Sequence, residues 1–97
     1  MMKWPPENLD DLLGRAAEIF RAAGAQDVYV FGSAATGRMH EHSDIDMAVE
    51  GLPPRRFYPT MAKVREVFKR PFDLVALEDD TPFVRYLREE GELKRVA

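Results

Sequence analysis

The sequence contains no cysteine among its 97 residues. This absence excludes disulfide bridges and thiolate zinc sites, and it fits a cytoplasmic protein. No apolar stretch approaches the ~18 residues that a membrane-spanning helix needs, and the first residues lack the apolar segment of a secretory signal. We therefore expect a cytoplasmic protein with no membrane partner.

Positive charge is also scarce, because 14 basic residues stand against 17 acidic ones and the formal net charge is −3. This balance argues against a protein that coats nucleic acid, so strong nucleic-acid binding is not expected. The same charge repels ATP mildly, and any nucleotide site therefore needs local positive charge or a metal ion.

The composition is typical of a globular protein, with 45% hydrophobic and 32% charged residues. The chain shows no internal repeat and no low-complexity tract. At this length we expect a single domain over residues 1–97.

Apolar periodicity predicts the order helix, strand, strand, helix, strand, helix. The first helix follows Asn8, a candidate N-cap, and ends at Gly24. The other predicted segments are strands 26–31, 44–49 and 72–77, a short helical turn at 34–37, and helices 57–68 and 82–91. Pro59 interrupts the apolar spacing of 57–68, so this helix either begins near Pro59 or has an irregular first turn. The last helix has Thr81 as its predicted N-cap. This order predicts an α/β (α+β) fold in which helices cover a small sheet.

Asp44 and Asp46 are the first candidates for a functional site. On a strand, residues two apart lie roughly 6.5–7 Å apart on one face, so the two carboxylates would repel each other unless a cation lay between them. Ala48 would share this polar face. Pairs of divalent ions serve nucleotidyl transfer, and Mg²⁺ accepts a few carboxylates together with phosphate oxygens and water.

Asp73 lies on the strand predicted at 72–77. If that strand pairs with 44–49, Asp73 would join the other carboxylates and could help to remove a proton from an attacking hydroxyl. Gly32 and Ser33 end an earlier strand and could grip a phosphate, because glycine lets the backbone approach a ligand closely and serine offers a hydroxyl. Each feature alone is more often a solvated turn or strand end; their combination favours a site.

The pattern Gly-Ser, ten residues, Asp-x-Asp, then a helix and a strand with a further Asp resembles the nucleotidyltransferase superfamily with a DNA polymerase beta-type palm. The short length and the Gly51–Pro54 turn look like the minimal nucleotidyltransferase (MNT) subgroup. This resemblance implies a small mixed or antiparallel palm-type sheet flanked by helices. It also implies that Gly32 and Ser33 hold ATP, and that Asp44, Asp46 and Asp73 bind two Mg²⁺ ions as catalytic carboxylates.

Members of this family often carry an arginine where Thr36 stands here, and Arg38 is a candidate substitute. Many MNT proteins are antitoxins paired with a HEPN-domain RNase toxin. The resemblance therefore implies transfer of AMP from ATP to a tyrosine of such a partner. Two other functions stay open: a non-catalytic antitoxin that neutralises its partner by binding, and a nucleotidyltransferase that acts on a small molecule or on RNA.

Several other side chains have two interpretations. His40 and His42 are solvated loop residues or metal ligands. Tyr58 and Tyr86 are expected to be half-buried, and Phe83 is expected in the core rather than at a partner surface. A basic set near the second long helix forms either a solvated face or a phosphate or partner contact; it comprises Arg55, Arg56, Lys63, Lys69 and Arg70.

Overall fold

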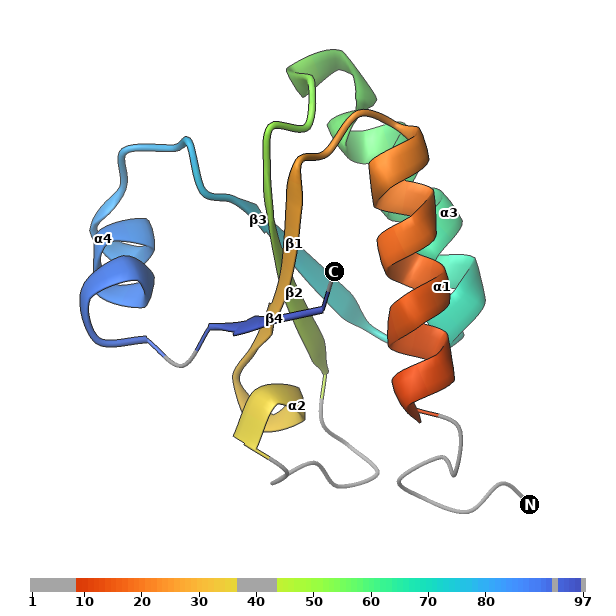
Figure 1. Cartoon of the computed structure of the whole chain (residues 1–97), viewed down its shortest axis with the longest axis horizontal. Helices are drawn as coiled ribbons and strands as arrows, with labels where there is room; N and C mark the ends of the chain where they lie inside the picture. The colour runs from red at the N-terminus through yellow and green to blue at the C-terminus, as the bar shows by residue number, and fades with distance from the viewer. Residues whose placement is uncertain (1–8, 37–43, 92, 97) are drawn as a thin grey trace.

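The computed structural model describes residues 9–36, 44–91 and 93–96. Figure 1 shows helices on both sides of a central sheet. The elements are α1 (Leu9–Ala22), β1 (Asp27–Phe31), α2 (Ser33–Thr36), β2 (Ile45–Glu50), the 3₁₀ helix η1 (Pro54–Arg56), α3 (Phe57–Phe68), β3 (Phe72–Ala76), α4 (Pro82–Glu89) and β4 (Lys94–Arg95). The predicted α/β fold is confirmed. Asn8 lies outside the described residues.

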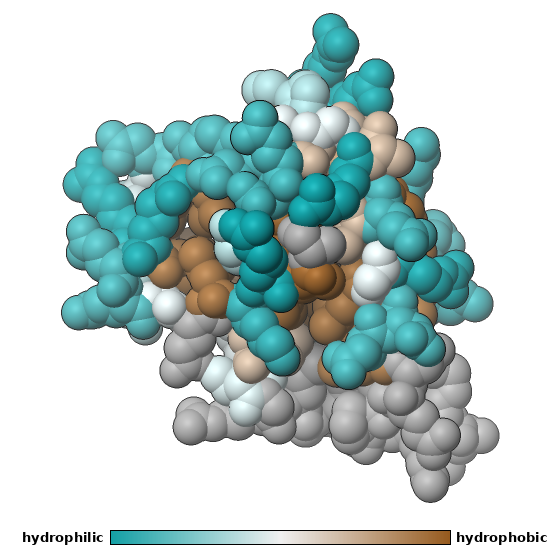
Figure 2. Space-filling model, viewed as in Figure 1, coloured by the Kyte–Doolittle hydropathy of each residue, from teal (hydrophilic) through white to brown (hydrophobic). Residues whose placement is uncertain are grey.

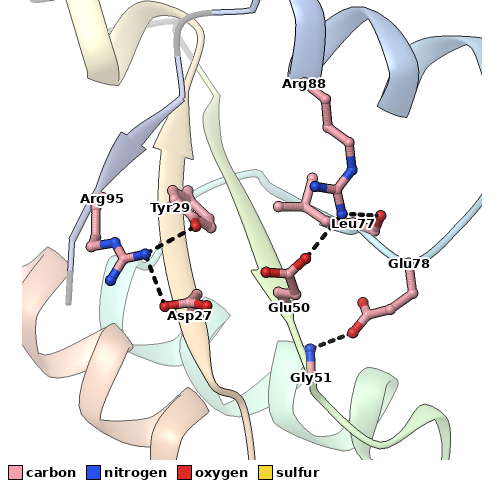
Figure 3. A network of polar contacts seen from close by, with 8 residues as sticks. All are labelled: Asp27, Tyr29, Glu50, Gly51, Leu77, Glu78, Arg88 and Arg95. Carbon is pink, nitrogen blue, oxygen red and sulfur yellow. Dashed lines mark hydrogen bonds and ion pairs between the residues drawn. The ribbon is translucent and has the colours of Figure 1, made fainter.

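The sheet has the strand order β3-β2-β1-β4. β1 runs antiparallel to β2 and to β4, whereas β2 and β3 are parallel. Parallel neighbours need a long crossover, and η1 with α3 supplies it. The sheet is therefore mixed, as the resemblance implied. β4 was not predicted, because a pair of exposed basic residues carries no strand pattern. Arg95 holds β4 to β1 through an ion pair of 3.2 Å with Asp27 (Figure 3).

One face of the sheet packs against α1 and α3. Ile45, Met47 and Val49 of β2 are fully buried there. The rings of Phe20 from α1 and Phe72 from β3 stack with their centroids 6.4 Å apart. This cluster is the larger of the two apolar cores, and we expect it to supply most of the folding free energy.

Among the described residues, the opposite face is covered only in part, by α4. Phe31 of β1, Ala48 of β2 and Leu77, which follows β3, pack there against Val84 and Leu87 of the helix. The prediction that Ala48 lies on a polar face was wrong: the small side chain is buried because α4 crosses above it. In the space-filling view, apolar atoms show between α4 and the strands, and hydrophilic side chains surround them (Figure 2).

Two sets of contacts hold α4 in place. The Thr81 hydroxyl accepts a hydrogen bond of 3.2 Å from the Val84 N–H, which confirms Thr81 as the N-cap. Arg88 donates to the Leu77 carbonyl at 2.8 Å and to the Glu50 carboxylate at 3.0 Å (Figure 3). The helix is thus tied to β2 and to the end of β3.

Three aromatic side chains are exposed, contrary to expectation. Tyr58 is 76% exposed, Tyr86 55% and Phe83 50%. α4 buries a narrow stripe at Val84 and Leu87. Tyr86 lies outside this stripe, and Phe83 reaches the core only through an edge contact with the Phe31 ring, 5.8 Å between centroids. Tyr58 lies on the first turn of α3, next to Phe57, which packs against the larger core instead. None of the helices in the described ranges combines the length and the apolar character that crossing a bilayer requires.

Candidate functional site

Asp46 and Asp73 lie side by side. Asp46 of β2 pairs with Asp73 of β3 in the parallel register, which confirms the predicted pairing of these strands. Neighbouring strands lie about 4.8 Å apart, and paired residues point to the same face. Residues two apart on a strand share a face, so Asp46 lies on the face of Ala48 and Asp73 on that of Val75, which α4 covers at its other end. The carboxylates thus lie on the part of this face that α4 leaves uncovered in the described structure.

Asp44 stands one residue before β2 rather than inside it, since the strand begins at Ile45. Its side chain is exposed, as is that of Asp73, whereas Asp46 is partly buried. Burial, then the charge of Asp73, then the charge of Asp44 raise the pKa of Asp46 above its ordinary value. Asp73 and Asp44 are therefore each close enough to Asp46 to repel its charge.

Gly32 lies directly against Asp46. Its φ is +68°, in the left-handed region that favours glycine. A Cβ atom there would lie 2.8 Å from the Asp46 Oδ2 atom. The preceding residue, Phe31, pairs with Asp46 in the β1–β2 register. The turn after β1 and the carboxylate of β2 are therefore packed as one unit.

Ser33 begins α2, the short helix that follows this turn. The Gly32 carbonyl accepts the Ala35 N–H at 3.1 Å. The Thr36 hydroxyl lies 3.3 Å from the same carbonyl and donates to it. Thr36 thus stabilises the turn and presents no positive charge. Arg38, His40 and His42 lie outside the described residues.

Positive charge comes instead from the end of α3. A hollow of about 580 Å³ beside Asp73 is lined by Arg65, Glu66, Lys69, Arg70, Pro71, Phe72 and Asp73. Burial lowers the pKa of Arg70, and the charge of Asp44 opposes this shift. Lys69, with φ of 55°, ends α3 in the left-handed conformation, which turns the chain toward β3.

The predicted basic set is therefore divided. Lys69 and Arg70 lie beside the carboxylates, whereas Arg56 and Lys63 line a different hollow next to α1. Arg65 was not among the candidates. It lies in the last turn of α3 and lines the same hollow as Lys69, the left-handed residue that ends the helix.

The carboxylates suit Mg²⁺ by charge and by chemistry. Mg²⁺ is a hard cation that uses one or two protein carboxylates and completes its shell with phosphate oxygens and water. Across residues 9–36, 44–91 and 93–96, no group of three or more His, Cys, Asp or Glu side chains has the spacing for a single ion. The residues fit an ion that is shared with a phosphate substrate better than one enclosed by protein.

Comparison with known proteins supports the same chemistry. The family described as polymerase beta, nucleotidyltransferase matches residues 16–93. A chain of a toxin–antitoxin complex with AMP-PNP has a TM-score of 0.70 at 22% identity and covers 92% of this chain and 73% of that chain. No curated protein sequence matches significantly.

Two further solved structures are similar. A chain from the tri-AMPylated Shewanella oneidensis HEPN toxin in complex with MNT antitoxin gives a TM-score of 0.66 at 20% identity, and the match covers 92% of this chain and 72% of that chain. A protein solved as a minimal nucleotidyltransferase gives a TM-score of 0.73 at 22% identity, and the match covers 88% of this chain and 91% of that chain. These likenesses show the fold. The family match spans most of the chain and includes Gly32, Ser33 and the three carboxylates, and the chain therefore belongs to the polymerase beta nucleotidyltransferase family.

Proposed function

We propose that this chain is a Mg²⁺-dependent nucleotidyltransferase that transfers AMP from ATP to a tyrosine of a HEPN-domain toxin, and that it acts as the cytoplasmic antitoxin. The observation that carries the proposal is the pairing of Asp46 with Asp73, with Asp44 in electrostatic reach. Two similar structures contain AMP-PNP and an AMPylated HEPN toxin, which favours this donor and this acceptor.

In this proposal the protein binds the donor at the turn after β1. Gly32 lets the triphosphate approach the backbone closely, and the Ser33 hydroxyl donates a hydrogen bond to a phosphate oxygen. Asp44, Asp46 and Asp73 would hold Mg²⁺, which when bound neutralises charge on the phosphate oxygens. Arg65, Lys69 and Arg70 reduce the repulsion between ATP and a protein of net charge −3.

The acceptor hydroxyl approaches from the open side of the carboxylates. Asp73 is exposed at the sheet edge, so it is the carboxylate best placed to receive the hydroxyl proton. The tyrosine oxygen then attacks the α-phosphorus. A new P–O bond forms, the bond between the α-phosphorus and the bridging oxygen breaks, and pyrophosphate leaves with that electron pair.

Replacing a single carboxylate tests the proposal. ATP labelled at the α-phosphate is incubated with Mg²⁺, the purified HEPN partner and either the wild-type protein or the Asp46→Asn variant. We expect label on the partner with wild-type protein and none with the variant. Asp10→Asn is the matched control, because Asp10 is an exposed carboxylate on α1, and it should transfer normally. Equal labelling by Asp46→Asn would rule out this role for the carboxylate.

A second function, neutralisation by binding alone, is favoured by the exposed aromatic side chains of Tyr58 and Phe83, a residue type that is enriched at protein–protein interfaces. The Asp44→Asn/Asp46→Asn double variant separates the two functions in cells that express the toxin. Loss of neutralisation supports catalysis. Undiminished neutralisation supports binding and contradicts the catalytic proposal.

A further inference from the structure

A further hollow of the described molecule lies along β3, beyond Asp73. It is a groove of about 730 Å³ along the free edge of β3, and Leu74, Val75 and Ala76 line it. One wall is the start of α3, with Tyr58, and the other is the start of α4, with Phe83. The two walls belong to opposite faces of the sheet, so the groove continues the plane of the sheet.

The groove exposes backbone hydrogen-bonding groups. The Pro71 carbonyl accepts the Ile45 N–H, and the Leu77 N–H donates to the Val49 carbonyl. The backbone N–H and C=O groups of the odd-numbered residues of β3 thus point toward β2. The direction of these groups alternates along a strand, so the backbone groups of Leu74 and Ala76 point away from β2. The Ala76 carbonyl accepts the Asp79 N–H at 3.1 Å. The Leu74 N–H and C=O and the Ala76 N–H therefore point into the groove, where an added strand would pair with them.

The walls suit the side chains of an extended segment. Successive side chains of a strand point to opposite faces, so a strand beside β3 would place one set against Tyr58 and the other against Phe83. These rings are 76% and 50% exposed. Exposed aromatic side chains beside a free strand edge are typical anchors of peptide recognition by strand addition.

Charge selects among the possible segments. The charged residues that line the groove are Glu78 and Asp79, both in the loop between β3 and α4. The Glu78 carboxylate accepts a hydrogen bond from the Gly51 N–H, which holds it at the rim (Figure 3). The complementary segment is therefore apolar with a basic side chain near one end.

We propose that this groove binds an extended segment of the partner protein, apolar with a basic residue, as an additional strand on β3. Asp73 immediately precedes Leu74 on the same strand, so a segment docked here lies next to the carboxylates. The role of this segment in presenting the acceptor rests on the proposed function, whereas its binding does not.

The test measures the affinity of the full chain for the purified HEPN partner. Ala76→Pro removes one outward N–H and is compatible with an edge strand. Phe83→Ser removes a wall, and Asp79→Lys reverses the charge at the rim. Tyr86→Ser is the matched control, because Tyr86 is a similarly exposed aromatic residue on α4 outside the groove. Circular dichroism checks whether each variant is folded. If Ala76→Pro does not fold, Phe83→Ser and Asp79→Lys decide the test.

We expect each groove variant to raise the dissociation constant about tenfold or more, with Tyr86→Ser near the wild-type value. The amides of Leu74 and Ala76 should gain protection from hydrogen exchange in the complex. Unchanged affinity in every groove variant, no binding by the wild-type chain, or a self-association that Ala76→Pro abolishes would each overturn the proposal. Groove-dependent binding without AMP transfer would leave it standing and refute the proposed function.

Discussion

At the scale of single residues, Gly32 is the position where a small substitution should have a large effect. A Cβ atom there meets the Asp46 carboxylate at 2.8 Å, and the φ of +68° disfavours any other residue. We expect Gly32→Ala to lower the free energy of unfolding by about 1–3 kcal/mol, measured by urea denaturation.

Gly14→Ala is the control for this substitution. Gly14 lies in α1, and a Cβ atom there has no heavy atom within 4 Å. Because alanine favours the helix more than glycine, this variant should gain up to about 1 kcal/mol. Gly32→Ala with wild-type stability would show that the turn and Asp46 are not packed as described.

The carboxylate of Asp46 should make stability fall as pH rises. Its folded-state pKa is raised by burial and by Asp73 and Asp44, so ionisation favours the unfolded chain. The stabilising contribution is fully present below the ordinary value of 3.8 and is lost as pH rises through the raised pKa.

We therefore expect Asp46→Asn to be more stable than wild type at pH 7 without divalent ions, and to lose this advantage near pH 3.5. Thermal unfolding across this range measures the difference, and Asp10→Asn, at an exposed position on α1, is the control. A variant that is less stable than wild type at pH 7 would contradict the cost of burying the Asp46 charge beside Asp73 and Asp44.

The carboxylates were predictable from sequence, but their surroundings were not. Asp44, Asp46 and Asp73 stand out because a period of two residues shows which side chains share a strand face. The contact between Gly32 and Asp46 and the effect of Asp44 on Arg70 depend on how the strands and α3 pack in space. No local pattern encodes such distances.

At the scale of elements, α4 depends on Arg88. This side chain joins the helix to the Leu77 carbonyl and to Glu50 of β2 (Figure 3). We expect Arg88→Ala to lower the free energy of unfolding by about 1 kcal/mol and to speed hydrogen exchange in α4.

Arg85 supplies the matched control on the same helix. Arg85 forms an ion pair with Asp80, and the two side chains are 65% and 79% exposed. Arg85→Ala should therefore lower the free energy of unfolding by less than about 0.5 kcal/mol. Equal effects of the two substitutions would mean that Arg88 does not anchor α4.

Most helices and strands could be predicted from periodicity, with ends that differ by a few residues. β2 runs from Ile45 to Glu50 instead of 44–49. α3 begins at Phe57, and Pro59 stands in its first turn, where a backbone N–H has no partner within the helix and its absence from proline costs nothing. β4 escaped prediction because it is short and polar. Its pairing depends on β1 being available.

At the scale of the whole molecule, the unequal cover of the sheet determines where function can lie. α1 and α3 close one face, and α4 covers only one end of the other (Figure 1). The carboxylates occupy the open end, with a basic hollow beside Asp73. The mixed sheet could be predicted through the family resemblance, whereas the groove along β3 could not, because it needs both helix starts in place.

The central claim is AMP transfer by the carboxylate site, and the mass of the partner protein tests it most directly. The purified HEPN partner is incubated with the wild-type chain, ATP and Mg²⁺, and the partner is then measured by intact-mass and peptide mass spectrometry. We expect AMP on a tyrosine of the partner, and none when EDTA removes the metal or when Asp46→Asn replaces the wild-type chain. An unmodified partner in a complex that forms normally, or a partner modified equally by Asp46→Asn, would contradict the claim.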